Sequence, residues 1–314
     1  MLQDKDIPLP ISNVYLSGLF VRRGELLRSL LSIDFKRSLV FLVGMAKVII
    51  FPDQASFENS RKYIDSMGVT ALVVQPPRFC LGLVAPTVID SGGPKSLADE
   101  LRQADVAVSG VIPYRPAAKE ILKASPPNSK WTEALGTLAV STVRPSLTDP
   151  LKLRVEVIPG KSLALLIPLM ARLIRGGSYR FDVPVLAFEE EHRLLVISPE
   201  RFVICRADDL LDAWIMLRSF VDLVISAWDS RSNLGPEKQR RQGIGAIEIF
   251  KRLPSTDCKR CGKQNCMEFA TGLFTGKFGI EQCAPIIEEE WRPRLESLQW
   301  LMQVIGLNGG TGNP

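Results

Sequence analysis

Residues 253–285 read LPSTDCKRCGKQNCMEFATGLFTGKFGIEQCAP, and this stretch decides how the C-terminal part of the chain must fold. It contains four of the six cysteines, in the spacing C-x2-C-x4-C-x16-C: Cys258, Cys261, Cys266 and Cys283. Three of the sulfurs come from one short loop, and the fourth comes from a distant position. Cytosolic proteins are kept reduced, so disulfides are not expected to occupy these thiols. Four clustered thiols without a metal would also be prone to oxidation. We therefore expect residues 253–285 to fold around a metal centre.

The cysteine spacing favours an iron-sulfur cluster over the alternatives. Each iron of a 4Fe-4S cube needs one external thiolate, so a tight loop that serves three corners and a remote cysteine that closes the fourth suit this cofactor. Zinc is the main alternative, because four thiolates make a tetrahedral site and C-x2-C is a common zinc half-site. Zinc ribbons usually pair two such knuckles, however, and the second is missing here. A disulfide ranks last. The expected ligands are Cys258, Cys261, Cys266 and Cys283.

The residues around the cysteines suit a negatively charged cluster. Gly262 permits backbone conformations and close approaches that a side chain would forbid. Cys266 begins a predicted helix, whose first turn would aim amide donors at the cluster. Met267, Ala270 and Phe274 recur at i, i+3 and i+7, which predicts the packed face of this helix.

Three basic residues lie among the first three cysteines, two between the first and second and one between the second and third. Lys259, Arg260 and Lys263 would add positive charge beside a cluster and raise its reduction potential. A solvated charged loop explains the same residues equally well, so both interpretations stay open.

The segment resembles the 4Fe-4S domain found in the large subunit of corrinoid/iron-sulfur proteins of acetyl-CoA synthesis and in the B subunit of the Rnf electron-transport complex. Two departures from the family pattern are Asp257, where Asn is frequent, and Ala284 before Pro285; neither removes a cysteine. The resemblance implies cluster binding, oxygen sensitivity and an anaerobic host, and it covers only the C-terminal segment. The residues that match are Leu253, Pro254, Thr256, Cys258, Cys261, Gly262, Cys266, Phe269, Ala270, Gly276, Lys277 and Cys283.

The resemblance does not carry an enzyme activity to this chain. The cobamide-binding barrel of the corrinoid protein needs an eight-fold β/α repeat, which residues 1–250 cannot hold beside a meander, and the membrane helix and further ferredoxin motifs of the Rnf subunit are missing. The C-x3-C-x2-C spacing of radical enzymes, G-x-S-x-G and H-E-x-x-H are also absent, so no catalytic residue is predicted. With every iron ligated, electron transfer or redox sensing is the default.

Three hypotheses follow for the whole chain. The first is an accessory electron carrier of anaerobic metabolism that exchanges electrons with a redox partner protein. The second makes the cluster, or a zinc ion, a structural element of a ligand-binding or scaffold protein. The third gives the N-terminal domain an enzymatic role with the cluster as its electron supply.

An α/β domain is expected over residues 1–126. Short runs rich in Val, Ile, Leu and Phe alternate with amphipathic stretches, which favours a largely parallel sheet. The expected strands are Val14–Phe20, Ser38–Val43, Lys47–Phe51, Thr70–Val74 and Val106–Ile112. The expected helices are Ala55–Met67, Lys95–Gln103 and Pro116–Lys123. The turn at Ser91–Pro94 could present amides to an anion, but an ordinary connection is the preferred interpretation.

A Pro- and Ser-containing linker at 124–130 leads to a predicted α+β domain over residues 131–236. Asp208 or Asp209 should cap the long buried helix. The expected strands are Leu135–Val143, Leu151–Val157 and a meander of Val185–Phe188, Arg193–Ser198 and Phe202–Arg206, with helices at Ser162–Ile174 and Leu210–Trp228. A small 4Fe-4S module over residues 240–300 follows and ends with a helix at Leu295–Ile305; residues 306–314 should be a disordered tail.

The composition is that of a globular protein with 46% hydrophobic residues and a net charge of +5. The apolar runs are too short to span a membrane and the start does not read as a secretory signal, so we expect a cytoplasmic protein without a transmembrane segment. No nucleic-acid partner is expected, because the basic run Lys238–Arg241 fits a solvated helix start as well as a phosphate contact. His192 is interpreted as a solvated loop histidine, and Cys80 and Cys205 as buried core residues.

Overall fold

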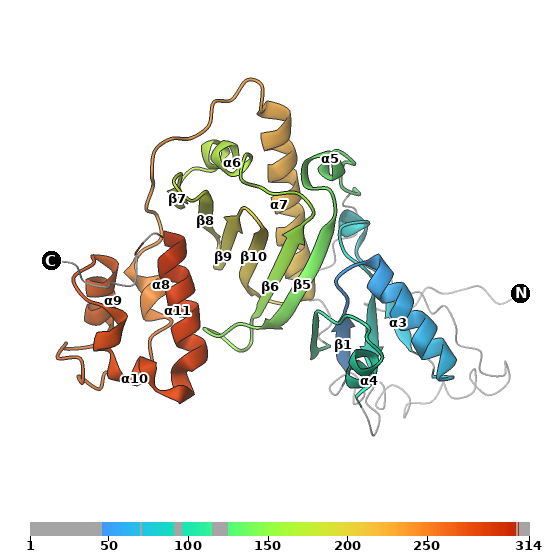
Figure 1. Cartoon of the computed structure of the whole chain (residues 1–314), viewed down its shortest axis with the longest axis horizontal. Helices are drawn as coiled ribbons and strands as arrows, with labels where there is room; N and C mark the ends of the chain where they lie inside the picture. The colour runs from blue at the N-terminus through green and yellow to red at the C-terminus, as the bar shows by residue number, and fades with distance from the viewer. Residues whose placement is uncertain (1–45, 70, 91–95, 115–124, 306, 308–314) are drawn as a thin grey trace, which may run out of the picture. The chain divides into compact units, whose positions relative to one another are not determined.

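The computed structural model describes residues 46–69, 71–90, 96–114, 125–305 and 307 (Figure 1). The chain divides into two compact units. The first comprises Met1–Asn128, Leu138–Arg144 and Asp209–Arg218, and the second comprises Ser129–Thr137, Pro145–Asp208 and Ser219–Pro314. The domain limits expected from the sequence, 1–126, 131–236 and 240–300, stay a prediction.

The first unit contains a four-stranded sheet in the order β2-β3-β1-β4, and every recorded strand pair is antiparallel. Its elements are β1 (Lys47–Ile50), α3 (Gln54–Ser66), β2 (Leu72–Val74), β3 (Thr87–Asp90), α4 (Leu97–Gln103) and β4 (Gly110–Pro113). The expectation of a largely parallel sheet is therefore wrong for the described strands.

The physical reason is that two crossovers interleave. Helix α3 joins β1 to β2 and α4 joins β3 to β4, so each helix does connect strands that run in the same direction. However, β3 lies between β1 and β2, and β1 lies between β3 and β4. This β-α-β-β-α-β arrangement is the ferredoxin-like topology, a description of connectivity that carries no function by itself.

The helices of this unit begin within two residues of the predicted positions, at Gln54 and Leu97. Asp53 caps α3, with its side chain accepting a hydrogen bond from the Ser56 N–H at 2.8 Å. Phe57 of α3 meets Phe51 edge to face at 5.9 Å between ring centroids, inside the core of the unit. The predicted helices Ala55–Met67 and Lys95–Gln103 are confirmed, whereas the strand expected at Val106–Ile112 begins only at Gly110.

Several expectations fall on other parts of the chain. The strands Val14–Phe20 and Ser38–Val43, the helix Pro116–Lys123 and the turn Ser91–Pro94 lie outside the described residues, as does the expected tail apart from residue 307.

The second unit is built on an antiparallel sheet in which β7, β8, β9, β10 and β6 are successive neighbours. The strands are β6 (Leu153–Pro159), β7 (Ser178–Arg180), β8 (Val185–Glu190), β9 (Arg193–Ser198) and β10 (Arg201–Ala207). Strand β5 (Leu138–Pro145) precedes them, and its residues to 144 belong to the first unit. The predicted meander is confirmed.

Successive side chains of a strand point to opposite faces of the sheet, and the two faces here have different partners. On one face, Phe202 of β10 stacks on Phe220 of the long helix α7 (Leu210–Ser230), with ring centroids 4.0 Å apart. The predicted long buried helix is thus present, and the Asp209 side chain accepts from the Asp212 N–H at its start.

The opposite face of this sheet shares one hydrophobic core with the C-terminal elements. These are α8 (Ala246–Phe250), α9 (Cys266–Phe274), α10 (Ala284–Ile287) and α11 (Arg292–Ile305). Val203 and Cys205 of β10 pack with Phe269 of α9 and Leu298 of α11, among others. The cysteine segment is therefore anchored on a rigid sheet.

Two further helices differ from expectation. Helix α6 (Ile167–Leu173) is shorter than the predicted Ser162–Ile174, and α5 (Trp131–Leu135) was not predicted.

Among the helices of the described residues, none is both long and apolar enough to cross a bilayer.

The basic run 238–241 is not a helix start, which corrects that interpretation. Arg241 donates hydrogen bonds to the carbonyls of Ala171 and Ile174 at the end of α6, and Arg240 donates to the carbonyl of Ile305 at the end of α11. Cationic donors satisfy the free carbonyls at helix C-termini. These arginines therefore hold the fold together.

Candidate metal centre

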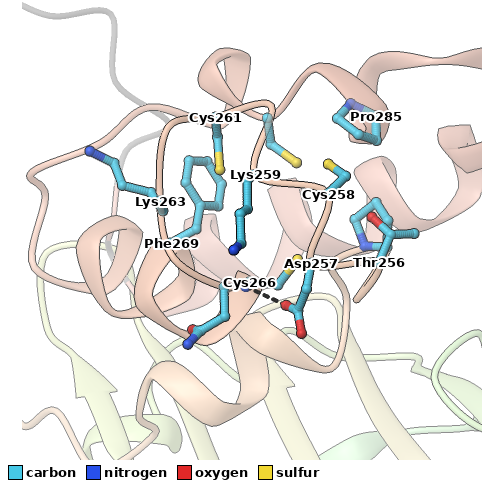
Figure 2. Close-up of a pocket in the computed structure, with 12 residues that line it drawn as sticks. Thr256, Asp257, Cys258, Lys259, Cys261, Lys263, Cys266, Phe269 and Pro285 are labelled. Carbon is cyan, nitrogen blue, oxygen red and sulfur yellow. Dashed lines mark hydrogen bonds between the residues drawn. The ribbon is translucent and has the colours of Figure 1, made fainter.

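All four cysteines of the C-x2-C-x4-C-x16-C pattern line one pocket (Figure 2). The sulfurs of Cys258, Cys261 and Cys266 point toward the space that the loop encloses. Cys258 is exposed and Cys261 is half-buried, whereas Cys266 and Cys283 are only 8% and 5% exposed. The pocket thus has one open edge, at Cys258, and a closed floor.

The loop that carries the first cysteines has an uncommon backbone. Ser255, Asp257 and Lys259 adopt positive φ angles of 56°, 47° and 57°, and Gly262 follows at 74°. Left-handed residues alternating with others form concavities of backbone N–H groups that bind anions, iron-sulfur clusters among them. Glycine is suited to such an angle, and nothing lies within 4 Å of the place where a Gly262 Cβ would be. The role expected for Gly262 is therefore one of backbone conformation.

Two hydrogen-bonded anchors join this loop to the start of α9. The Cys266 N–H donates to Asp257 Oδ1 at 2.7 Å. Asn265 is the N-cap and accepts from the Glu268 N–H at 2.8 Å, while Glu268 accepts from the Gln264 N–H at 2.7 Å. Sequence reasoning missed both anchors, although N-x-x-E before an apolar run resembles a capping box. An Asn at 257 has the same acceptor oxygen, so the departure at this position preserves the bond.

The helix predicted to begin at Cys266 is confirmed as α9. Of the face expected to pack, Ala270 is buried and Phe274 packs partly buried against the core, whereas Met267 is not part of it. Met267 is 38% exposed, whereas Cys266, Phe269, Ala270 and Leu273 are buried. These residues follow i, i+3, i+4 and i+7, the spacing of a single helical stripe. The helix thus turns its first cysteine, rather than Met267, inward.

Aromatic and ionic contacts support residues around the pocket. Phe269 stacks on Phe278 with centroids 5.8 Å apart, and Lys263 Nζ lies 3.9 Å from the Phe278 centroid. Arg260 forms an ion pair with Glu288, just after α10, at 2.8 Å. Of the three basic residues considered from the sequence, Lys259 and Lys263 line the pocket and Arg260 ties the loop to the distant segment.

The thiols differ in acidity because they differ in environment. A hydrogen bond from the Arg260 backbone N–H, and then the Thr256 hydroxyl, lower the pKa of the Cys258 thiol. Burial raises the pKa of Cys266 and of Cys283, and the neighbouring thiols raise that of Cys283 further. A bound metal ion deprotonates a coordinating thiol, and this deprotonation opposes a larger burial penalty at Cys266 and Cys283 than at Cys258.

The other two cysteines lie elsewhere and are buried, as expected. Cys80 donates to the Trp214 carbonyl at 3.2 Å, and Arg154 Nη1 lies 3.5 Å from Cys205 Sγ. His192 lies in the turn between β8 and β9, half-exposed, with Nε2 at 3.1 Å from Asp208 Oδ1. None of these side chains lines the cysteine pocket.

Residues 253–285 match the family model described as "Putative Fe-S cluster". The gamma subunit of the acetyl-CoA decarbonylase/synthase complex of Methanocaldococcus jannaschii is 50% identical over 44 residues, which cover 14% of this chain and 9% of that protein. The corrinoid/iron-sulfur protein large subunit of Moorella thermoacetica is 33% identical over 54 residues, covering 17% and 12%.

The gamma subunit of Methanopyrus kandleri is 36% identical over 59 residues, covering 19% and 12%. This chain thus spans only about a tenth of the length of the curated relatives it matches. No solved structure matches the chain. The C-terminal segment is an iron-sulfur segment similar to those of these complex subunits, as its sequence indicates.

Proposed function

We propose that Cys258, Cys261, Cys266 and Cys283 bind one 4Fe-4S cluster. The observation that carries the proposal is that four thiols, one for each iron of a cube, line a single pocket. The residues around them suit an anionic group, since the loop has alternating left-handed residues and α9 begins at Cys266. The family model and the names of the relatives support an iron-sulfur cofactor.

Zinc is the alternative occupant of such a site, because four thiolates also suit one tetrahedral ion with Zn–S distances of about 2.3 Å. A loop that carries three cysteines and a remote fourth suit the corners of a cube, and the matching family model describes an iron-sulfur cluster. Both observations favour a cluster over a single zinc ion.

The function that this site supports best is accessory electron transfer with a redox partner protein, in the anaerobic cytosol. A fully ligated cluster supplies one-electron chemistry and leaves no iron open to a substrate. The exposed Cys258 gives a partner access to one edge, while Cys266 and Cys283 shield the opposite side from water.

A structural role is the second candidate, and a specific observation favours it. Cys266 and Cys283 belong to the same hydrophobic core as Phe269 and the inner face of the sheet. A metal centre bound there would join the loop, α9 and α10 much as a disulfide or zinc ion does in a small domain. The two roles differ because only a carrier needs a reversible redox couple that a partner can reach.

Anaerobic redox titration separates the two candidates. The full chain, purified without oxygen, should show broad visible absorption that bleaches with dithionite and returns on reoxidation through several cycles. The matched variant Cys258→Ser changes the exposed ligand alone and should lose the absorption, while Cys80→Ser should leave both the absorption and the midpoint potential unchanged. Iron-loaded protein that accepts no electron would refute the carrier and leave the structural role. Stoichiometric zinc would refute both the carrier and the cluster.

A further inference from the structure

A second cavity, separate from the cysteine pocket, lies within the second unit and has a volume of about 340 Å³. Four chain segments meet around it: the turn between β5 and β6, the turn between β8 and β9, the end of β10 and the residue after α8. It is lined by Thr148, Asp149, Lys152, His192, Arg206 and Lys251. Segments that are far apart in the sequence thus bring polar and basic side chains to one hollow.

The lining of this cavity is positively charged. Lys152, Arg206 and Lys251 contribute three positive charges and Asp149 one negative charge, which leaves +2 with His192 neutral. Asp149 is already engaged in its own turn, because its Oδ1 accepts from the Leu151 N–H at 3.0 Å. The wall therefore offers more cationic donors than anionic acceptors.

Carboxylates that do not line the cavity hold these cations in place. Asp208 forms ion pairs with both Lys152 and His192, and Glu248 forms ion pairs with both Lys251 and Arg206. A basic side chain fixed in this way loses little rotamer entropy when a ligand arrives, which favours binding.

Arg206 occupies a strained position that aims it at this place. Its φ is 67°, and the register of β10 shifts between Cys205 and Ala207. A residue at such an angle is strained and persists only when its surroundings hold it, and bulges re-aim side chains next to functional sites. The side chain is 12% exposed, and among the described residues its Nε is buried without a hydrogen-bond partner. The two terminal nitrogens of the guanidinium pair with Glu248 and Glu189, so the Nε–H is the donor that a ligand in the cavity could still satisfy.

We propose that this cavity binds a compact polyanion that carries phosphate or carboxylate oxygens. The volume lies near the lower end of the range for small-molecule sites, and Lys and Arg donors form strong charge-assisted hydrogen bonds with such oxygens. The lining residues include no Phe, Tyr or Trp on which a nucleobase could stack. The proposal is independent of the metal centre.

The single histidine of the chain provides a direct probe of this cavity. One imidazole signal in the NMR spectrum of the full-length protein belongs to His192 without further assignment. We would titrate the protein at constant pH and ionic strength with inorganic pyrophosphate, with citrate and, as the control for screening, with chloride. Saturable movement of the signal with pyrophosphate or citrate, but not with chloride, is the expected result, and the tighter of the two identifies phosphate or carboxylate as the preferred group.

Two lysine variants test whether binding is at the cavity. Lys152→Gln and Lys251→Gln should each weaken the affinity roughly tenfold, the loss of one charge-assisted contact. Lys130→Gln is the matched control, because Lys130 is also a half-exposed lysine paired with a carboxylate, Asp229, but does not line the cavity. The affinity of either lysine variant is a sufficient test, provided that the variant is folded. Unsaturable movement alike for all three salts, or unchanged affinity in a cavity variant that remains folded, would overturn the proposal.

Discussion

Glu248 should be among the most costly residues to remove from the second unit. Its side chain is 2% exposed and pairs with Arg206 of β10 at 3.1 Å and with Arg252 at 3.1 Å. Arg252 in turn donates to Ser297 of α11 at 3.2 Å. One carboxylate therefore links the sheet to the elements that precede and follow the cysteine loop.

The magnitude follows mainly from Arg252, which would lose its buried carboxylate partner in Glu248→Ala, whereas Arg206 would keep its ion pair with Glu189. Arg206 and Arg252 are 12% and 4% exposed, so neither can recover full hydration. Removing one partner of a buried ion pair costs about 3–5 kcal/mol. The third partner, Lys251, is 36% exposed and adds at most about 1 kcal/mol. We expect a loss of about 4 kcal/mol in the free energy of unfolding.

Urea unfolding followed by circular dichroism measures this loss. With a slope of about 3 kcal/mol per molar urea, the midpoint should fall by more than about 1 M. The matched control is Glu289→Ala, which removes a carboxylate that is 84% exposed and pairs with Arg292 at 3.0 Å; it should change the stability by less than about 1 kcal/mol. If Glu248→Ala cost no more than this control, the reasoning about the buried cluster would be refuted.

Three further predictions concern the same unit. Gly272→Ala should lower the melting temperature even though alanine favours helices by about 1 kcal/mol, because its Cβ would lie 1.9 Å from the Phe278 ring; a higher melting temperature would contradict the packing. Burial pushes the pKa of Glu248 upward, but Lys251, Arg252 and Arg206 hold it below its ordinary value. The stability that this lowered pKa contributes is present above about pH 4.3, the ordinary value of a glutamate, and is lost as the pH falls through the folded-state pKa. The difference in unfolding free energy between wild type and Glu248→Gln, measured in urea, should therefore disappear in acid. A difference that does not change with pH would be evidence against this. Cys205→Ser should retain full metal content by elemental analysis, since Cys205 contacts Arg154 outside the pocket, and metal loss would show that the ligands are wrongly chosen.

The candidate site could be predicted from the sequence because its geometry is local. Three cysteines within nine residues must share one loop whatever the rest of the chain does, and Gly262 and the helix start at Cys266 depend on short-range backbone chemistry. On α9 the spacing i, i+3 and i+7 predicts a packed face of Met267, Ala270 and Phe274, and of these only Met267 is wrong. Only the contact with the sheet decides in favour of Cys266 and Phe269.

The arrangement of the first sheet could not be predicted in the same way. Hydrophobic periodicity reports which residues are buried but not which strands are neighbours, so alternating strands and helices favoured parallel pairing. The structure interleaves the two crossovers instead. The position of Arg206 is a second example. Strict alternation along β10 would place its side chain on the face of the sheet opposite to that of Cys205. The shift in register between Cys205 and Ala207 brings it to Glu248, and nothing in the local sequence indicates that shift.

The most direct test of the account is the iron, sulfide and zinc content of the full chain purified without oxygen. We predict about four irons and about four acid-labile sulfides per chain, falling sharply in each of Cys258→Ser, Cys261→Ser, Cys266→Ser and Cys283→Ser. One zinc ion per chain with no labile sulfide would contradict the central claim, as would a full complement of iron in any of the four variants.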